Sequence, residues 1–462
     1  MAEAAFARRD IFESYPIPRA VMTLSVPTIL SSLVSVLYSL ADTYFVGLLN
    51  NPVQTAAVTL AAPVLLAFNA VNNLFGVGSS SMMSRALGRK DYDTVRRSSA
   101  FGFYCALACA LVFSLVCTAF RAPLLRLLGA NAETTGATAS YLLWTVCCGA
   151  APSILNVVMA YLVRSVGATL HASIGTMSGC LLNIVLDPIF ILPWGLNMGA
   201  AGAGLATFIS NMVACAYFFV LLFTRRKSTF VSLNPRHLRR VDRHIVVGVC
   251  AVGVPAAIQN LLNVTGMTVL NNFTAAFNSN AVAAMGISQK LCMIPMYISQ
   301  GLSQGLMPLV SYNYASGNVR RMKGAVVFAA KISLSFLVGM AALYYLFAGG
   351  LISLFMENAD VVAYGTRFMR GLCLATPFLN MDFLAVGVFQ ACGMGKKSLI
   401  FAIMRKIVLE IPALYILNAL FPLYGLAYAQ LCAEVVLASA AVVVLLRLFR
   451  KLEKRHAEVN AT

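Results

Sequence analysis

The sequence predicts an all-α polytopic membrane protein, with twelve transmembrane helices in two six-helix lobes related by pseudo-two-fold symmetry along the membrane normal. Three observations predict this fold class. The 462 residues are 60% hydrophobic and only 11% charged, with a mean hydropathy of +0.81, whereas a soluble domain has about 25% charged residues. The positive charges are unevenly divided among the loops, and the two halves of the chain repeat the same motifs.

Twelve stretches are long and apolar enough to cross a bilayer, which takes about 20 residues. They lie at about 20–47, 56–80, 98–120, 139–162, 168–192, 200–224, 246–274, 281–310, 325–347, 365–391, 398–420 and 424–447. A single hydrophobic core stops growing at about 250–300 residues, so this much apolar sequence requires lipid. The first twenty residues lack a small-residue cleavage site, and the first span is expected to act as its own insertion signal.

The distribution of positive charge predicts the cytosolic side. With twelve spans, alternate loops face the same side, and 28 of the 34 Lys and Arg residues fall in one set of loops and tails, a set that includes Arg405 and Lys406. The opposite set holds only Arg121 and Arg126. By the positive-inside rule, both termini and the basic linker 225–244 are expected in the cytosol. No basic face is interleaved with aromatic residues, so the net charge of +18 does not indicate a nucleic-acid partner.

Three pairs of motifs indicate that the chain is a duplicated half. VPTILSSLVSV at 26–36 resembles VPAAIQNLLNV at 254–264, DTVRR at 93–97 resembles GNVRR at 317–321, and NIVLDP at 183–188 resembles KIVLEI at 406–411. Six spans per half is an even number, so the halves are expected to be parallel repeats. The expected domains are an N-terminal lobe at 1–224, a cytosolic linker at 225–244 and a C-terminal lobe at 245–462.

The sequence contains no complete nucleotide-binding motif. GMGKKS at 393–398 resembles the end of a phosphate-binding loop, but position 390 is Gln rather than the required first glycine. The stretch also follows a predicted membrane span rather than a strand. No cofactor is therefore expected, and an ion gradient would have to drive any active transport.

The strongest candidate site surrounds a carboxylate in the fifth span. Gly175, Gly179, Asn183 and Asp187 recur every four residues and form one stripe of a helix. The two glycines allow another helix to approach closely, and the Asn183 amide can share a proton or ion with the carboxylate. Pro188 frees a backbone carbonyl one turn earlier because it has no N–H. Ionisable residues within membranes are functional candidates by default, so this stretch predicts a cation site.

Asp42 in the first span is the second candidate. It ends a stripe of serines, and Tyr38 lies one turn before it on the same side. Asp42, Asp187 and Thr207 lie at similar distances from the outer ends of their spans, so they are expected at one level of the N-terminal lobe. The alternative is a set of separate structural hydrogen bonds in a wet cavity.

The second half offers a weaker candidate. Glu410 is the repeat-mate of Asp187, but Asp42 falls opposite about Leu270 and has no acidic counterpart. The carboxylates of Asp382, Glu410 and Glu434 are expected either to form a C-lobe polar site or to be structural partners of Lys290, Lys331 or Arg405.

Five motifs carry a family resemblance through their order, spacing and duplication: ADTYFVG at 41–47, RALGRKD at 85–91, NIVLDPIF at 183–190, GAAGAGLAT at 199–207 and PLVSYNYASGN at 308–318. Together they resemble the multidrug and toxic compound extrusion (MATE) family over nearly the whole chain. The overall pattern is similar to the bacterial drug-efflux branch close to the DinF-like subfamily.

This resemblance implies a protein of the bacterial inner membrane that exports small-molecule drugs or organic cations in exchange for inward H⁺ or Na⁺, and we expect it to be a monomer. The family's cation-coupling site maps onto Asp42, Asn183, Asp187 and Thr207, with Na⁺ held at Asp42 and Asp187 if it is the coupling ion. No structural metal is implied. Tyr38 and Asn156 fall where related transporters line the substrate cavity. Other branches use acidic residues on spans seven and ten, where this chain has Gln259 and, close to the expected place, Asp382.

Two alternative functions stay open on the sequence alone. A lipid-linked saccharide flippase of the same superfamily would require a strongly basic cavity, and few cations lie within the predicted spans. An intramembrane aspartyl protease could use Asp42 and Asp187 as a proton-sharing pair, but the sequence lacks a GxGD motif.

Overall fold

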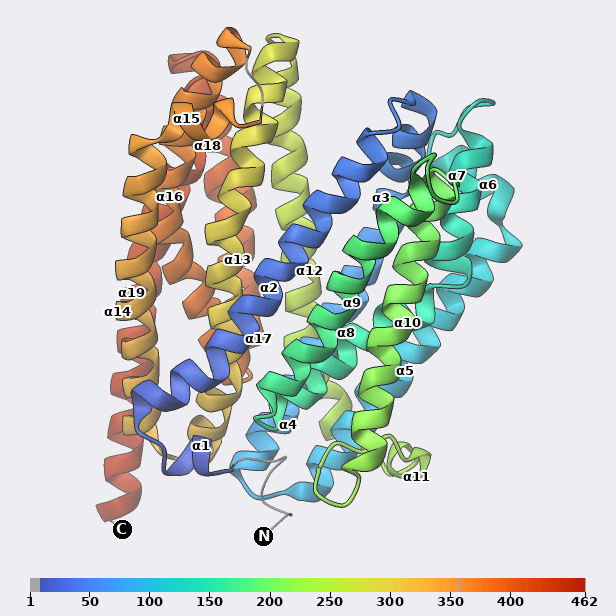
Figure 1. The fold of residues 1–462 in the computed structure, drawn as a ribbon. Helices are drawn as coiled ribbons and strands as arrows, with labels where there is room; N and C mark the ends of the chain where they lie inside the picture. Colours follow the sequence, from blue (N-terminus) through green and yellow to red (C-terminus); the bar gives the residue numbers. More distant parts are fainter. Residues whose placement is uncertain (1–8, 356–357, 462) are drawn as a thin grey trace. The chain divides into compact units, whose positions relative to one another are not determined.

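The computed structural model describes residues 9–355 and 358–461, and all regular secondary structure in these ranges is helical (Figure 1). The helices before the linker are α1 (Arg9–Glu13), α2 (Ile17–Gly47), α3 (Pro52–Val71), η1 (Asn72–Val77), α4 (Gly78–Gly88), α5 (Tyr92–Ala119), α6 (Arg121–Leu127), α7 (Thr135–Leu142), η2 (Leu143–Cys147), α8 (Ala150–Ser165), α9 (Thr169–Ile191) and α10 (Ala200–Thr224). Those that follow are α11 (Pro235–Leu238), α12 (Arg243–Ala275), α13 (Ser279–Ala315), α14 (Val319–Leu346), α15 (Ala348–Ser353), α16 (Ala359–Ala391), α17 (Gly395–Ile403), η3 (Met404–Glu410), α18 (Ile411–Leu420) and α19 (Leu426–Ala461).

These helices confirm the predicted all-α membrane fold. Within the described ranges, ten helices are long and apolar enough to span a bilayer, and the pair Thr135–Cys147 and Ala150–Ser165, bent by 45°, supplies an eleventh. The remaining predicted span, 398–420, lies on α17, η3 and α18. Its charged residues Arg405, Lys406 and Glu410 explain why composition and length alone do not mark it as a span.

The chain divides into two compact units, and two helices contribute to both. Among the described residues, the first unit contains 9–12 and Leu30–Ala257, and the second contains Glu13–Ile29 and the chain from Ile258 onward. The boundaries therefore fall inside α2 and α12, just after Pro27 and Pro255. A proline inside a helix removes one backbone hydrogen bond and allows a bend, which suits a helix whose two ends belong to different units. The expected lobe boundaries at 224 and 245 differ from these and stay a prediction.

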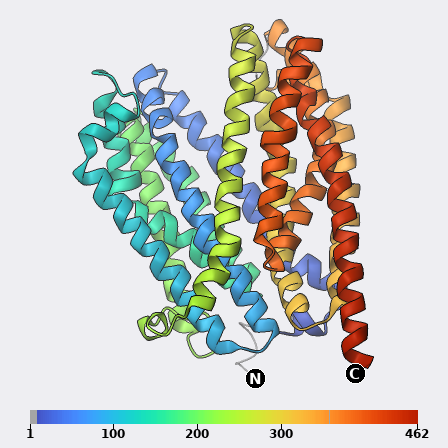
Figure 2. The same ribbon diagram turned by 180° about the vertical axis from the view of Figure 1, so that it is seen from behind.

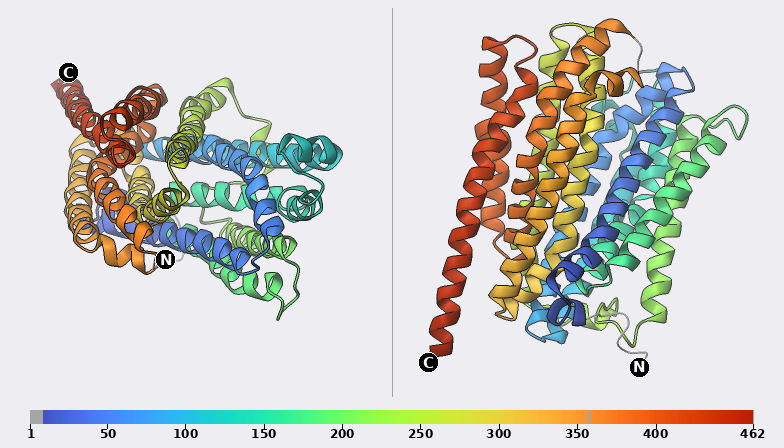
Figure 3. Two further views of the ribbon diagram at one scale, coloured as in Figure 1. Left: turned by 90° about the horizontal axis from the view of Figure 1, so that it is seen from above. Right: turned by 60° about the vertical axis from the view of Figure 1, so that its left-hand side comes forward.

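Within the first unit, α9 packs closely against α10 (Figure 3). A side-chain Cβ added at Gly179 would lie 3.0 Å from the Cβ of Ala214 and 3.2 Å from the carbonyl oxygen of Ser210. One added at Gly175 would overlap the ring of Phe218. The small residues of the predicted stripe therefore let the two helices approach, and this approach positions the polar end of α9 against α10.

In the second unit, α16 is the central helix and packs against α13, α14 and α19 (Figure 2). Asp382 lies on this helix and is buried, with 1% of its surface exposed. A carboxylate on a central helix cannot reach solvent, so it requires partners from the neighbouring helices.

We expect Gly179→Leu to lower the thermal stability of the purified protein, because overpacking a tight contact costs about 1–3 kcal/mol. Gly339→Leu in α14 is the matched control, since a Cβ there would meet nothing within 4 Å. Melting curves of both variants in the same detergent test this. Equal melting temperatures would contradict the close approach of α9 and α10.

Candidate ion-coupling site

Four residues of the predicted cation site lie in the first unit on three helices. Asp42 is on α2, Asn183 and Asp187 are on α9, and Thr207 is on α10. Asp187 is completely buried and Asn183 is 2% exposed, whereas Asp42 and Thr207 are half-buried. The fourfold spacing along α9 places Asn183 one turn from Asp187 on the face that packs against α10.

The Asn183 amide connects α9 with α10. In the orientation that satisfies both of its ends, its nitrogen donates to the two carboxylate oxygens of Asp187 at 2.8 and 3.3 Å, and its oxygen accepts from the Thr207 backbone N–H at 3.1 Å. In the opposite orientation only a 3.4 Å contact with the Thr207 hydroxyl remains. The network of hydrogen bonds decides an amide orientation, and it favours the first. Asp187 is thus held by an uncharged donor.

Asp42 and Asp187 lie within electrostatic range of each other, and no cation of the described residues forms an ion pair with either. The Oδ1 atom of Asp42 is buried and has no hydrogen-bond partner in the described part of the chain, and the Asp42 carboxylate acts on that of Asp187. No ion pair within residues 9–355 and 358–461 involves either residue. A buried carboxylate next to a half-buried one with a buried, unsatisfied oxygen can bind a small cation or a proton when no ion pair neutralises either within the described ranges.

Two tyrosines lie within electrostatic range of this pair. Tyr38, one turn before Asp42 on α2, neighbours the Thr207 hydroxyl and lies within electrostatic range of both carboxylates. Tyr141 on α7 lies within the same range, and its side chain is buried. Sequence reasoning missed Tyr141, because nothing in the linear pattern relates α7 to Asp42, although Thr138, Tyr141 and Thr145 follow helical spacing.

Asn156, the other residue expected to line a cavity, is used in a contact between α8 and α10. It is 5% exposed, and its amide donates to the Pro152 carbonyl at 2.8 Å and to Asn211 Oδ1 at 2.9 Å. No hydrogen bond within the described residues joins it to the Asp42–Asp187 pair, so its role in a cavity stays a prediction.

The second unit holds a different arrangement, in which Arg405 of η3 bridges two helices. Its Nη1 donates to Asp382 Oδ2 of α16 at 2.8 Å, and its Nε lies 3.9 Å from Glu434 Oε1 of α19. The second distance is too long for a hydrogen bond, and both Glu434 oxygens are buried without a hydrogen-bond partner in the described ranges. Arg405 also donates to the side chain of Asn263 on α12.

Lys406 is the second internal cation. Its Nζ lies 2.6 and 2.8 Å from the two carboxylate oxygens of Glu410, one turn further along η3. Arg405 is 2% exposed and Lys406 is 8% exposed. The assignment of these two residues to a cytosolic loop was therefore wrong, because their side chains pair with carboxylates inside the second unit.

The structure thus brings Asp382, Glu410 and Glu434 together with two cations rather than leaving them as separate carboxylates. Of the three cations considered as partners, Arg405 forms an ion pair with Asp382. Lys290 and Lys331 form no ion pair within residues 9–355 and 358–461. Within the same ranges, no group of three or more His, Cys, Asp and Glu side chains could hold a metal ion.

The two sites occupy equivalent places in the repeat. Asn183 and Asp187 in NIVLD correspond to Lys406 and Glu410 in KIVLE. In each case the first side chain donates to the carboxylate one turn later. The donor is a neutral amide in the first unit and an ammonium in the second.

Comparison with known proteins agrees with this duplication. Residues 27–189 and 255–416 each match the MatE family model, and together they form more than half of the chain. The chain belongs to the MatE family. The multidrug export protein MepA of Staphylococcus aureus (strain MRSA252) is 35% identical to this MatE protein over 436 residues, which are 94% of each chain. The MepA of Staphylococcus saprophyticus is 35% identical over 97% of this chain and 98% of its own.

Solved structures of the same family share the fold. An outward-facing multidrug resistance MATE family transporter is 27% identical to this MatE protein, with a TM-score of 0.88 over 94% of this chain and 96% of its own. Because the family consists of transporters, this protein is a transporter and not an enzyme. The alternative of an intramembrane aspartyl protease is therefore wrong.

We expect Arg405→Gln to lower the melting temperature strongly, because breaking a buried ion pair leaves uncompensated charge and costs about 3–5 kcal/mol. Adding Asp382→Asn to Arg405→Gln removes one of the orphaned charges and should restore part of the loss. The control is Lys323→Gln, which breaks a pair with Glu453 at 2.8 Å that is 41% and 45% exposed and should cost at most about 1 kcal/mol. Similar melting temperatures for Arg405→Gln and the control would contradict the buried network.

Proposed function

We propose that this MatE protein is a secondary active transporter that exports amphipathic, often cationic, drugs in exchange for inward H⁺ or Na⁺. The observation that carries the proposal is the pair of the half-buried Asp42 and the buried Asp187, which has no internal counter-charge in the described part of the chain. The drug-export names of the MepA relatives support the substrate class. The protein needs no cofactor, and the cation is a transported substrate.

The chemistry of the pair supports an exchange mechanism. A bound proton or Na⁺ reduces the repulsion between the two carboxylates, and a cationic drug is attracted to the pair when it is ionised. Each ligand therefore favours a different state of the same site, which is the requirement for exchange. Where a cycle moves one net charge inward, a membrane potential of about 150 mV supplies roughly 3.5 kcal/mol, enough for a drug gradient of a few hundred-fold.

We propose that the carboxylates of the second unit have a structural role. Arg405 and Lys406 already supply two positive charges to Asp382, Glu434 and Glu410. Because these cations belong to the chain, they cannot be exchanged during a transport cycle. Coupling therefore resides in the first unit, at Asp42, Asn183, Asp187 and Thr207.

The relatives are bacterial, and the chain is a multi-pass protein of the cell membrane. We propose that both termini lie in the cytosol and that the protein acts as a monomer. The charge asymmetry supports this orientation even after Arg405 and Lys406 are removed from the cytosolic set, because the opposite loops hold only Arg121 and Arg126.

Dye efflux from proteoliposomes tests the function and its coupling ion. Purified protein is reconstituted with a cationic dye inside, and either a proton gradient or a Na⁺ gradient is imposed. We expect one gradient to drive dye movement and the other to have little effect. Dye movement that responds to neither gradient would contradict coupled export.

We expect Asp187→Asn to abolish gradient-driven efflux while the protein still folds, because the variant removes one charge from the coupling pair. Glu410→Gln should be much milder, since Glu410 is already paired with Lys406. Efflux rates and melting temperatures are measured for both. Equal loss of efflux in the two variants would show that both units couple.

We expect Asn183→Lys to uncouple transport without unfolding the protein. A lysine at this position would reproduce the Lys406–Glu410 pair next to Asp187 and occupy the site with a tethered ammonium. Asn183→Gln is the control, since it keeps an uncharged amide donor. Wild-type efflux in Asn183→Lys would exclude Asp187 as the site of the exchanged cation.

A further inference from the structure

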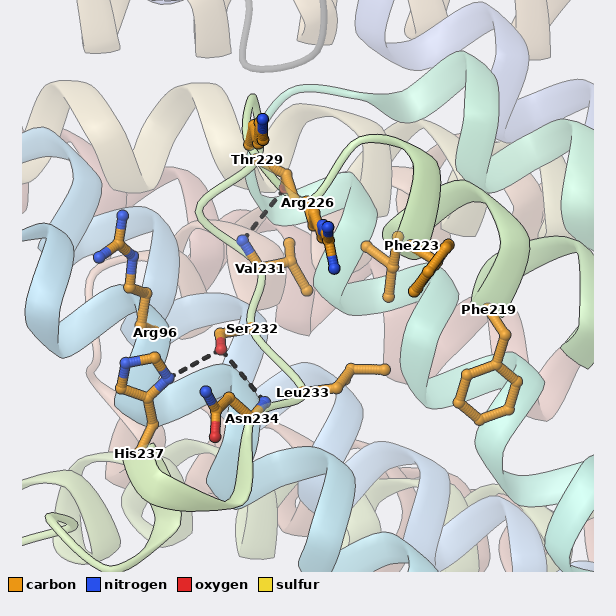
Figure 4. A pocket seen from close by; sticks show the side chains of 12 residues that line it. Arg96, Phe219, Phe223, Arg226, Thr229, Val231, Ser232, Leu233, Asn234 and His237 are labelled. Atoms are coloured by element: carbon orange, nitrogen blue, oxygen red, sulfur yellow. Dashed lines mark hydrogen bonds between the residues drawn. The ribbon is translucent and has the colours of Figure 1, made fainter.

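A pocket of about 630 Å³ lies in the first unit at the ends of α5 and α10, beneath the linker that follows α10 (Figure 4). Its polar side is formed by Arg96 and His237, and its apolar side by Phe219 and Phe223. Arg226 and Lys227 also line it. The ion-coupling residues Asp42 and Asp187 take no part in its lining, so it is a second, separate feature of this unit.

The linker is packed against α5, which gives the pocket a defined wall. The backbone N–H of Ser232 donates to the Ser99 hydroxyl at 2.9 Å, and the Tyr104 hydroxyl donates to the Leu233 carbonyl at 2.7 Å. The rings of Tyr92 and Phe230 are stacked with centroids 4.4 Å apart. These contacts fix the segment that carries the basic side chains.

The pocket is positively charged, and no acidic residue lines it. Arg96, Arg226 and Lys227 form no ion pair within residues 9–355 and 358–461. Among the acidic residues of the neighbouring segments, Asp93 and Asp242 are paired with Arg97, at 2.9 and 3.2 Å, and Asp91 caps α5 by accepting from the Thr94 backbone N–H at 3.1 Å.

The positive charge of the pocket also affects the pKa of His237. Burial and the charge of Arg96 lower the pKa of this imidazole below its usual value. Its Nδ1 lies 2.8 Å from the Ser232 hydroxyl, which is also in the lining. Neutral hydrogen-bonding groups and Arg96 thus share one side of the pocket (Figure 4).

The other side of the pocket is apolar and belongs to a membrane helix. Phe219 is 40% exposed and Phe223 is 70% exposed. Arg226 and Lys227 follow almost directly after Thr224, the last residue of α10. The cations therefore lie at the level of lipid head groups, while the two rings lie toward the acyl chains. Arg226 stacks on Phe223, with its guanidinium 5.2 Å from the ring centroid. This contact places a cation directly beside the apolar side of the pocket.

We propose that this pocket binds an anionic phospholipid, with Arg96, Arg226 and Lys227 around its phosphate and an acyl chain along Phe219 and Phe223. Basic pockets at the ends of membrane helices suit phosphate head groups. A soluble phosphate would use the cations but would leave the apolar side uncovered. The bound lipid would join α5, α10 and the linker. This site is independent of the export function proposed above.

The test is the affinity of the purified full-length protein for phosphatidylglycerol and phosphatidylcholine, measured in detergent by native mass spectrometry. The pocket variant combines Arg96→Gln, Arg226→Gln and Lys227→Gln. The matched control combines Arg225→Gln, Arg236→Gln and Arg239→Gln, which removes the same charge outside the pocket lining. Each cation near a lipid head group contributes about fivefold, so the pocket variant should bind phosphatidylglycerol roughly a hundredfold more weakly.

We expect the control to keep most of its preference for phosphatidylglycerol. Equal loss in both triple variants would show a general charge effect and overturn the site, as would unchanged binding in the pocket variant. Displacement of the lipid by millimolar inorganic phosphate would show that the pocket recognises a soluble anion instead. If the pocket triple variant does not fold, the single variants Arg226→Gln and Lys227→Gln replace it, each with an expected loss of about fivefold.

Discussion

Hydrocarbon does not solvate charge, so every carboxylate inside the membrane must find its partner within the protein or among transported ions. The two units of this chain satisfy that requirement in different ways. The second unit supplies the partners itself, with Arg405 and Lys406 held against three acidic side chains. In the first unit, no described residue forms an ion pair with Asp42 or Asp187. An exchangeable ion is useful only where the protein has not already provided a permanent one.

The duplication shows how a small chemical change separates these solutions. One turn before the acidic residue, the first half has an amide and the second has an amine, and both donate to the carboxylate that follows. The geometry is retained while the local charge differs by one unit. Symmetry of the backbone therefore does not imply symmetry of function, and a site must be assigned from its own side chains.

Hydropathy, charge asymmetry and internal repeats were enough to predict the all-α fold and the helices that carry Asp42, Asn183, Asp187 and Thr207. The position of Asn183 one turn before Asp187 on α9 could be predicted, because helical spacing is a local property. The place of Tyr141 near Asp42 could not be predicted, because it depends on how α7 packs. Arg405 and Lys406 were misplaced because charged residues in a predicted span are easily taken for a loop. The alignment of KIVLE with NIVLD already indicated that Lys406 lies inside a span, since it places Lys406 opposite Asn183.

The sharing of α2 and α12 between units has a consequence for biogenesis. Residues 243–257 complete the first unit, although they are synthesised after the linker, and residues 13–29 belong to the second unit, although they are synthesised near the start. A ribosome that has finished α10 has therefore not yet delivered all of the first unit. Two separate polypeptides, cut at the linker, would each lack a segment that the other carries. Fusion into one chain guarantees that these segments are delivered in equal numbers to the same membrane location.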